Sequence, residues 1–375
     1  MTAPATPRLL RRLNAERLLG ALRDAGGPLR VTELMARTGL SRPTVDAVAD
    51  ELLRLGWAVE VAAEPAARGR PARSLAFAAD GGHVAGVDIG EVKVRTAVAN
   101  LRGEVVAERT ATFAGAERLP VIRREARQVL KEGGVRKDEL LGAVVGCTGA
   151  MDSASGRVLF SSVFPSGYDL AKALAGTLGR PLTVENDCNL AVLAERWCGA
   201  ARGLEDVVCV LAGERIGAGI LVGGKLMRGH AGAAGELAFL GAYEVEHGAQ
   251  GIGQLVRDLA GREPEAVFEA AGAGDREALA VVERAERWAG IGIVTTAQIV
   301  NPELVVIGGG VARAGDVLLA PLRRRLDAMV RMPPRLAASP LAERGPLLGA
   351  IRLALDELEP RLLDGLEKPE AAAAH

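Results

Sequence analysis

The sequence predicts an α/β fold in which a small helix-rich domain precedes a larger, duplicated α/β body. Three observations predict it. The first 80 residues show helical spacing followed by two short apolar runs, and this segment differs in net charge from the rest. A strand, glycine turn and strand then occur twice, about 125 residues apart. With 375 residues, 49% of them hydrophobic, the chain is long enough for two or three domains with buried cores.

The charge of the chain is distributed unevenly between these segments. Its 46 basic and 47 acidic residues give a net charge of −1, which by itself argues against a nucleic-acid partner. Residues 1–80, however, hold twelve Arg and nine acidic residues, a charge of +3, and the remainder carries −4. The total therefore hides a basic N-terminal segment. Aromatic residues make up only 3%, which argues against a surface that stacks single-stranded bases.

Three helices are expected in the N-terminal segment. The first covers residues 15–24, where leucines have helical spacing. The second is capped by Thr32, extends to Thr38 and ends at Gly39. The third begins at Ser41, which is a favourable N-cap residue. One apolar face of this third helix consists of Val45, Val48, Leu52 and Leu55.

Two short apolar runs at 57–61 and 75–78 follow these helices and suit strands, with arginines between them. Three helices followed by a two-stranded ribbon with a basic tip is the order of a winged helix-turn-helix. The start of its third helix can reach phosphates and base edges, and the tip an adjacent minor groove. The predicted DNA-contacting residues are Ser41, Arg42, Thr44, Arg68, Arg70 and Arg73. The alternative is a small helical interaction domain with a charged hairpin, and Met35 is a departure from the helix-turn-helix pattern, which usually holds alanine there.

The body contains three glycine clusters, each directly after an apolar strand. The strands and clusters are 84–89 with Gly90, 207–212 with 213–219, and 304–307 with Gly308, Gly309 and Gly310. Backbone amides in such turns can surround an anion or admit a nucleotide. A single cluster is weak evidence because most glycines only mark turns, but three in a duplicated α/β chain are much stronger.

The chain resembles the repressor, open-reading-frame and kinase family, called ROK, from about residue 10 to 360. After the winged helix-turn-helix, the motifs that carry the likeness are VAGVDIG at 84–90, VEND at 184–187, AGE at 234–236 and GGGV at 308–311. The family contains both transcriptional repressors and sugar kinases, so membership alone does not decide the function.

The resemblance implies a winged helix-turn-helix at residues 1–80 joined to a two-lobed, ribonuclease-H-like body of the actin and hexokinase type. The first lobe would cover residues 81–190 and be completed by a C-terminal helix near 346–360. The second lobe would cover residues 191–345 and carry a dimerisation surface, with a sugar cleft between the lobes. The tail at 367–375 is expected to be disordered.

The resemblance also implies roles for individual residues. Asp187 matches the catalytic base of the kinases, Asn186 a sugar-binding amide and Glu236 a carboxylate that binds sugar hydroxyls. Surface or capping roles for the two carboxylates are the alternative. Phe239 replaces a histidine and could stack on a ligand ring, and Gln254 replaces a carboxylate. These five residues are the predicted ligand site.

Both phosphate loops depart from the kinase pattern. Where kinases have Asp-Ile-Gly-Gly-Thr-Lys the chain has DIGEVK, with Glu91 in place of a glycine, and the second loop, GERIGAG, introduces Glu214 and Arg215. Two carboxylates in a phosphate cradle argue against ATP, although Arg215 could bind an anion or pair with either glutamate. The residues assigned to these degenerate nucleotide loops are Asp88, Gly90, Glu91, Glu214, Arg215, Gly217, Gly219, Gly308, Gly309 and Gly310.

The zinc motif of the family kinases is absent as well. The run at 245–254 contains no cysteine, and His247 alone cannot make a four-ligand site. No metal and no cofactor are therefore expected. The four cysteines lack metal-ligand spacing and are expected to be reduced, mostly buried thiols; they are Cys147, Cys188, Cys198 and Cys209.

These features predict a cytoplasmic DNA-binding transcriptional regulator, a repressor rather than an activator. Asp187 would be a vestigial base, and the kinase-like body would sense a sugar or related metabolite. The expected partners are a pseudo-palindromic operator in double-stranded DNA, a sugar-like effector and further copies in a homodimer or dimer of dimers, with no membrane. The alternatives are a sugar kinase that phosphorylates a hexose with ATP and has a fused DNA-binding domain, and a regulator whose body only dimerises.

Overall fold

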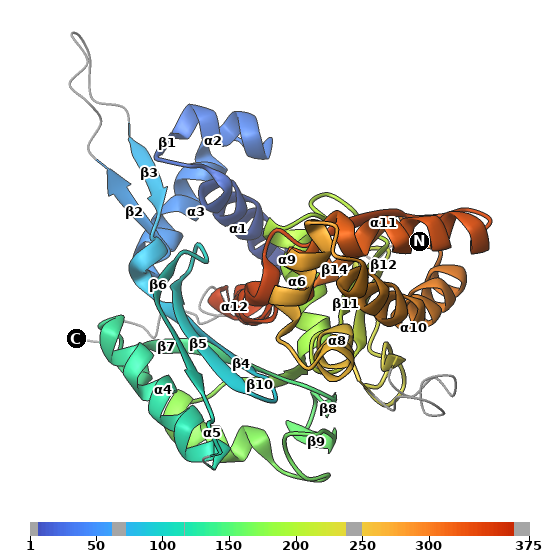
Figure 1. The fold of residues 1–375 in the computed structure, drawn as a ribbon. Helices are drawn as coiled ribbons and strands as arrows, with labels where there is room; N and C mark the ends of the chain where they lie inside the picture. The colour runs from blue at the N-terminus through green and yellow to red at the C-terminus, as the bar shows by residue number, and fades with distance from the viewer. Residues whose placement is uncertain (1–6, 62–72, 116, 238–249, 364–375) are drawn as a thin grey trace.

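The computed structural model describes residues 7–61, 73–115, 117–237 and 250–363, which form a small N-terminal domain and a larger two-sheet body (Figure 1). The N-terminal domain consists of α1 (Pro7–Asp24), β1 (Leu29–Arg30), α2 (Val31–Thr38), α3 (Arg42–Arg54), β2 (Ala58–Val61) and β3 (Ser74–Phe77). This order confirms the predicted helices and strands. The structure adds β1, which pairs with β3 and completes a sheet in the order β1-β3-β2, and α1 begins earlier than expected.

The start of α2 differs from the prediction. The helix begins at Val31 with Arg30 at the N-cap, and the Glu33 carboxylate accepts a hydrogen bond of 2.7 Å from the Arg30 amide. Thr32 therefore lies inside the first turn and does not cap it. Gly39 ends the helix as predicted, with φ 70°, in the left-handed region that glycine adopts at little cost.

The body is built from two five-stranded sheets with the same topology. The first sheet has the order β10-β7-β4-β5-β6. Its strands are β4 (His83–Ile89), β5 (Lys93–Asn100), β6 (Val105–Thr112), β7 (Leu140–Cys147) and β10 (Leu182–Asn186). The second has the order β13-β12-β11-β14-β15. Its strands are β11 (Val207–Leu211), β12 (Gly217–Val222), β13 (Lys225–Leu226), β14 (Leu304–Gly308) and β15 (Arg335–Ala338).

In both sheets the first strand along the chain pairs antiparallel with the second and parallel with the fourth. Thus β4 lies between β5 and β7, as β11 lies between β12 and β14. The two sheets therefore confirm the duplication that the repeated strand and glycine pattern predicted.

Helices cover the sheets and fill the space between them. The α-helices of the body are α4 (Arg118–Glu132), α5 (Leu170–Leu178), α6 (Asp187–Cys198), α8 (Ile252–Ala260), α9 (Pro264–Gly272), α10 (Arg276–Val300), α11 (Asp316–Met329) and α12 (Gly345–Leu362). A small ribbon, β8 (Ala150–Asp152) and β9 (Arg157–Phe160), flanks the first sheet, and short 3₁₀ turns include η4 (Gly310–Ala314) and η5 (Ala342–Arg344). Helix α12 packs on β4 and β7, α6 packs on β11 and β12, and the two helices pack on each other between the sheets.

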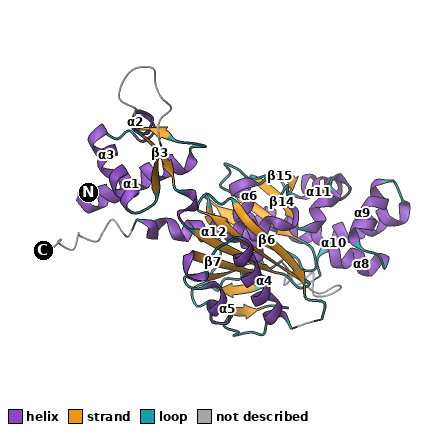
Figure 2. Cartoon of the chain, turned by 90° about the vertical axis from the view of Figure 1, so that its left-hand side faces the viewer, coloured by secondary structure: helices purple, strands orange, loops and turns teal. Residues whose placement is uncertain are grey.

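The N-terminal domain lies at one end of the body (Figure 2) and shares an apolar core with α12. Buried residues of α1 and of β3 belong to the same cluster as buried residues in the last turns of α12. From the domain these include Leu18, Leu19, Leu22 and Phe77, and from α12 Leu355, Leu358 and Leu362. The domain is thus packed on the C-terminal helix and is not joined to the body by a linker alone.

The cysteines are free thiols, and all are buried except Cys198, which is half-buried, as predicted. The predicted disordered tail at 367–375 lies outside the described residues. Within the described chain, no helix combines the length and apolar character needed to cross a bilayer.

Candidate functional site

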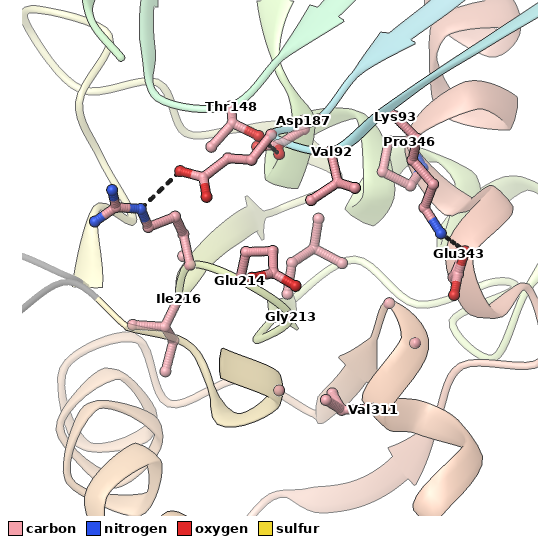
Figure 3. Close-up of a pocket in the computed structure, with 18 of the residues that line it drawn as sticks. Val92, Lys93, Thr148, Asp187, Gly213, Glu214, Ile216, Val311, Glu343 and Pro346 are labelled. Atoms are coloured by element: carbon pink, nitrogen blue, oxygen red, sulfur yellow. Dashed lines mark hydrogen bonds and ion pairs between the residues drawn. The ribbon is translucent and has the colours of Figure 1, made fainter. Parts of the chain in front are cut away.

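A cleft of about 730 Å³ lies between the two sheets. The turn after β4 and the start of β5 form one wall, and the turn between β11 and β12 forms the other (Figure 3). Predicted site residues that line the cleft are Asp88, Gly90, Glu91, Asn186, Asp187, Glu214, Arg215, Gly217, Glu236, Gly309 and Gly310. The structure therefore brings together residues that are separated by more than 200 positions in the sequence.

Of the residues predicted for the ligand site and the nucleotide loops, three lie outside the cleft lining and a fourth lies outside the described residues. A Cβ on Gly219 would lie 2.0 Å from the Cys188 carbonyl oxygen, and one on Gly308 would lie 2.8 Å from Leu211 Cδ2, so these glycines permit close packing. The Gln254 amide is held on α8, where it donates to Asp258 at 2.7 Å and accepts from Arg257 at 2.8 Å. Phe239 lies outside the described residues.

The carboxyl ends of three parallel strands supply one end of the cleft. Asp88 lies near the end of β4, Thr148 directly follows β7, and Asp187 directly follows β10. The Thr148 hydroxyl donates a hydrogen bond of 2.7 Å to the Asp187 carboxylate (Figure 3). Thr148 was not among the predicted site residues, although a polar residue after a buried parallel strand is the signal that could have identified it.

Asn186 and Asp187 form the start of α6. The Asn186 side-chain oxygen Oδ1 caps the helix by accepting a 3.0 Å hydrogen bond from the Asn189 backbone amide, and Asn186 Nδ2 donates to the Gly149 carbonyl oxygen at 2.8 Å. The same Nδ2 lies 3.4 Å from Glu236 Oε1. Asp187 accepts a 2.9 Å hydrogen bond from the Cys188 amide. Asn186 therefore caps α6 in place of Asp187, and the Asp187 carboxylate lies in the cleft wall.

Burial dominates the electrostatics of these carboxyl groups because it disfavours their charged form. Burial and the nearby Asp187 raise the pKa of Glu236 to about 7. Burial raises the pKa of Asp88 to about 7 as well, although Arg95 at 3.1 Å opposes the shift. Burial also raises the pKa of Asp187, against the hydrogen bonds from Thr148 and Cys188. At neutral pH this end of the cleft can therefore hold or release protons.

A buried carboxylate behind this site was also missed. Glu185 is 1% exposed and accepts hydrogen bonds of 2.9 Å from both the Asn186 amide and the Asn189 side chain. Its other oxygen accepts a 2.6 Å hydrogen bond from Arg228, which lies on the loop that leads to Glu236. Glu185 therefore fixes the Asn186 backbone and links β10 to the second lobe. The only signal in the sequence for a role of Glu185 was its position directly before Asn186 and Asp187.

Arginines neutralise the carboxylates in the two altered phosphate loops. Arg215 lies 2.8 Å from Glu91, one of the two partners that the sequence suggested. Glu214 is 3.1 Å from Arg257 of α8 instead, a partner 43 positions away that the sequence did not indicate. The Glu91 and Arg215 pair joins the equivalent turns of the two sheets across the cleft.

A third ionic cluster lies at the start of α12. Glu343 contacts both Lys93 and Arg95, which are on β5 (Figure 3). These contacts hold the pKa of Glu343 below its ordinary value, even though burial opposes the shift. Counted over the described lining of the cleft, eight acidic and four basic side chains leave a formal excess of four negative charges. The cleft therefore disfavours a polyanion and suits a neutral ligand rich in hydroxyl groups.

The third helix of the N-terminal domain, α3, has one buried and one exposed face. Val45, Val48 and Leu52 are buried as predicted, and Leu55 is half-buried. At the N-terminus Ser41 is the cap residue, with its hydroxyl 2.8 Å from that of Thr44. The Arg42 side chain is 71% exposed and lies 3.8 Å from Asp46.

The arginines of the predicted wing have different environments. Arg73 lies 2.6 Å from Asp50 of α3 and 3.2 Å from Glu60 of β2, so it connects the wing to the third helix. Arg68 and Arg70 lie outside the described residues, as do Phe239 and His247. No group of three or more His, Cys, Asp or Glu side chains suited to a metal occurs in the part of the chain that the structure describes.

Comparison with known families divides the chain as the fold does. The sequence profile of the IclR helix-turn-helix domain matches residues 4–62. The profile of the ROK family matches residues 84–250 and 249–357. Together these matches cover the three helices of the N-terminal domain and both sheets of the body, but not β3.

Similar proteins include kinases and repressors. A glucokinase of Thermotoga maritima is 31% identical over 71% of this chain and 95% of its own length. A xylose repressor of Caldicellulosiruptor bescii is 24% identical over 87% of this chain and 92% of its own. The crystal structure of a ROK family transcriptional regulator, a homologue of the Escherichia coli MLC protein, superposes with a TM-score of 0.75 at 21% identity. That structure covers 95% of this chain and is covered to 99%, which shows that the whole architecture is shared.

Proposed function

The chain belongs to the ROK family, and on that basis we propose that it is a sequence-specific DNA-binding transcriptional regulator that acts as a repressor. In this proposal the body binds a sugar or related metabolite in the cleft and has no kinase activity. One observation carries the proposal. A helix-turn-helix domain with an exposed third helix is packed on a kinase-like body, and each phosphate loop of that body contains a carboxylate that is paired with an arginine.

The N-terminal domain supports the DNA-binding part of the proposal. Ser41, Arg42 and Thr44 lie at the start of α3, where a recognition helix contacts phosphates and base edges in the major groove. Arg68 and Arg70 would extend the contact from the wing, with Arg73 holding the wing against α3. Two such domains in a homodimer or a dimer of dimers, associated through the second lobe at residues 191–345, would read a pseudo-palindromic operator.

The cleft supports the metabolite-sensing part. Asn186, Asp187 and Glu236 offer an amide and two carboxylates within one wall, and carboxylates accept hydrogen bonds from sugar hydroxyl groups. The names of the relatives, glucokinase and xylose repressor, make a hexose or pentose the first candidates. Glu91 and Glu214 occupy Arg215 and Arg257, so these arginines are not free to bind phosphate, and the cleft as a whole keeps an acidic excess, which disfavours ATP.

A sugar kinase with a fused DNA-binding domain is the second candidate. Asp187, which lies in the cleft and is hydrogen-bonded to Thr148, and the glucokinase relative favour it. A coupled ATP-turnover assay over a panel of hexoses tests it, with Asp187→Asn as the control. We expect no turnover above background. Turnover that Asp187→Asn abolishes would establish the kinase.

The main experiment is to map the DNA that the purified protein binds and then to measure affinity for that site against salt. We expect competitor-resistant binding that weakens as the salt concentration rises, because Arg and Lys contacts release counterions. Arg42→Ala should reduce the affinity and make the slope of log affinity against log salt concentration smaller in magnitude by about one. Arg136→Ala is the matched control, since Arg136 is also 71% exposed and paired with acids but lies on the body. Absence of competitor-resistant binding by the wild-type protein would refute the proposal.

A further inference from the structure

Helix α12 touches the cleft at one end and the N-terminal domain at the other. We propose that α12 transmits the state of the cleft to the DNA-binding domain, by way of the Glu343 ion cluster at its start and of Trp57, Arg23 and Arg12 at its end. The inference rests on the proposed function for the meaning of the signal, but the contacts themselves do not depend on it. The helix has 18 residues, so it spans about 27 Å.

The first turn of α12 forms part of the cleft. Pro346 lines the cleft, and Glu343 of η5, just before the helix, holds Lys93 and Arg95 (Figure 3). Arg95 in turn lies 3.1 Å from Asp88. A ligand or a lobe movement that changes the charge around these residues therefore acts directly on the start of α12.

Backbone contact couples α12 to the helix that carries the predicted ligand residues. A Cβ on Gly349 would lie 1.8 Å from the Leu190 carbonyl oxygen of α6, so the two helices touch without an intervening side chain. On the other side, a Cβ on Gly86 of β4 would lie 3.1 Å from the Leu347 carbonyl oxygen. Since α6 begins at Asp187, a shift at its start cannot be absorbed by side-chain rearrangement between the helices.

Polar contacts fasten the far end of α12 to the N-terminal domain. The Trp57 indole donates a 3.0 Å hydrogen bond to the Leu362 carbonyl oxygen. Arg23 lies 2.8 Å from Glu359, and Arg12 donates a 2.9 Å hydrogen bond to the Pro360 carbonyl oxygen. These contacts surround the shared apolar core, so a rotation or translation of the end of α12 must move the domain.

Coupling between two sites requires an element with two arrangements that both sites bias. In this proposal the Glu343 cluster is that element. Its carboxylate contacts Lys93 and Arg95 from the first sheet and lies 3.8 Å from Arg313 of η4, beside the second. Opening of the cleft would separate these two sets of cations, and Glu343 would then follow one of them and take the start of α12 with it.

The three tryptophans of the chain provide reporters for this path. Trp57 is at the end of α12, and Trp197 on α6 lies 5.9 Å from the Arg352 guanidinium of α12. Trp288 is buried in α10, in the core of the second lobe and off the path. Their indole N–H signals in a ¹H–¹⁵N spectrum of the full-length protein, assigned by single Trp→Phe variants, report each location without DNA or effector.

Glu343→Gln is the test variant, and Glu263→Gln is its matched control because Glu263 also lines the cleft but pairs with Arg257 of α8. We expect Glu343→Gln to shift the Trp57 and Trp197 signals while Trp288 stays in place, and Glu263→Gln to leave Trp57 unchanged. Lys93→Gln, which removes a partner of Glu343 from the other side, should shift Trp57 in the same way. An unmoved Trp57 signal in both Glu343→Gln and Lys93→Gln, or an equal shift with the control, would overturn the inference.

Operator affinity then shows whether the domain uses this path. The effects of Glu343→Gln and Trp57→Phe on affinity are measured alone and together. If the two sites are independent, the product of the two single effects on affinity should equal the effect of the double variant within about twofold. We expect the affinity of the double variant to differ by more than about threefold from the value that the two single effects predict. Agreement with that value would refute transmission to the DNA-binding surface. Failure of the wild type to bind DNA would refute the proposed function alone, because the indole experiment contains no DNA.

Discussion

Substitution of Glu236 by Gln should stabilise the protein at alkaline pH and change its stability little in acid. In the folded protein burial, together with the nearby Asp187, raises the pKa of Glu236 from 4.5 to about 7. Its described polar contact is weak, with Asn186 Nδ2 at 3.4 Å. A carboxyl group with a raised pKa binds more protons in the folded state than in the unfolded state. It therefore lowers the free energy of unfolding as the pH rises from about 4.5 through about 7.

The size of the effect follows from that pKa difference. At 1.36 kcal/mol per pH unit, the charged form of Glu236 costs the folded state up to about 3 kcal/mol above pH 7.5. Partial solvent exposure and the coupling to Asp187 reduce this to about 2 kcal/mol. For a chain of this length, 2 kcal/mol corresponds to a Tm increase of about 3 °C. Gln keeps the shape and the hydrogen-bonding capacity of the protonated carboxyl group, so packing should not change.

The assay is thermal and urea unfolding of wild type and Glu236→Gln at pH 5 and at pH 8.5. We expect a gain of only about 0.5 kcal/mol at pH 5, where about a quarter of the effect has developed, and a gain of about 2 kcal/mol at pH 8.5. Glu265→Gln is the control, because Glu265 is an exposed carboxylate on the rim of the same cleft, and its effect should not vary with pH. If Glu236→Gln destabilised the protein equally at both pH values, the carboxylate would be stabilised by partners and the electrostatic reasoning would be wrong.

Three further predictions concern other parts of the molecule. Leu358→Ala, at a site 5% exposed in the core shared with the N-terminal domain, should lower the free energy of unfolding by about 2–5 kcal/mol and expose that domain to limited proteolysis before the body. Glu91→Gln should change the free energy of urea unfolding by less than about 1 kcal/mol, because Arg215 is 43% exposed and regains water. Glu185→Gln should weaken the binding of glucose or xylose, whichever binds the wild type in calorimetry, more than Glu265→Gln does, because the Arg228 contact that orders the site is lost.

Periodic and local features of the fold were predictable from the sequence. Alternating apolar runs and glycine turns predicted both copies of the sheet, and Gly39 and Ser41 marked the boundaries between α2 and α3. The two-residue strand β1 was not predictable, since it has no pattern of its own and exists only through its pairing with β3. The cap of α2 was assigned to Thr32 by residue type, whereas Arg30 takes that position because β1 ends there.

The location of the candidate cleft was predictable for part of the residue set, whereas the interactions of these residues were not. The motifs placed Asn186, Asp187 and Glu236 together, and the cleft contains all three. The pairing of Glu214 with Arg257 depends on how α8 packs, which no local pattern encodes. The pairing of the buried Glu185 with the partly exposed Arg228 depends in the same way on the approach of the two lobes. Ion pairs between residues far apart in the sequence therefore decide which carboxylates are available to bind a ligand.

The shared core of the N-terminal domain and α12 has a consequence for synthesis of the protein. The domain is made first, but Leu355, Leu358 and Leu362, which complete its core, belong to the last described helix. A nascent or prematurely terminated chain would therefore carry a DNA-reading helix on a domain with an exposed apolar face. Competence to bind an operator should arise only when translation has passed residue 362, which would spare promoters from occupation by fragments that lack the sensing body.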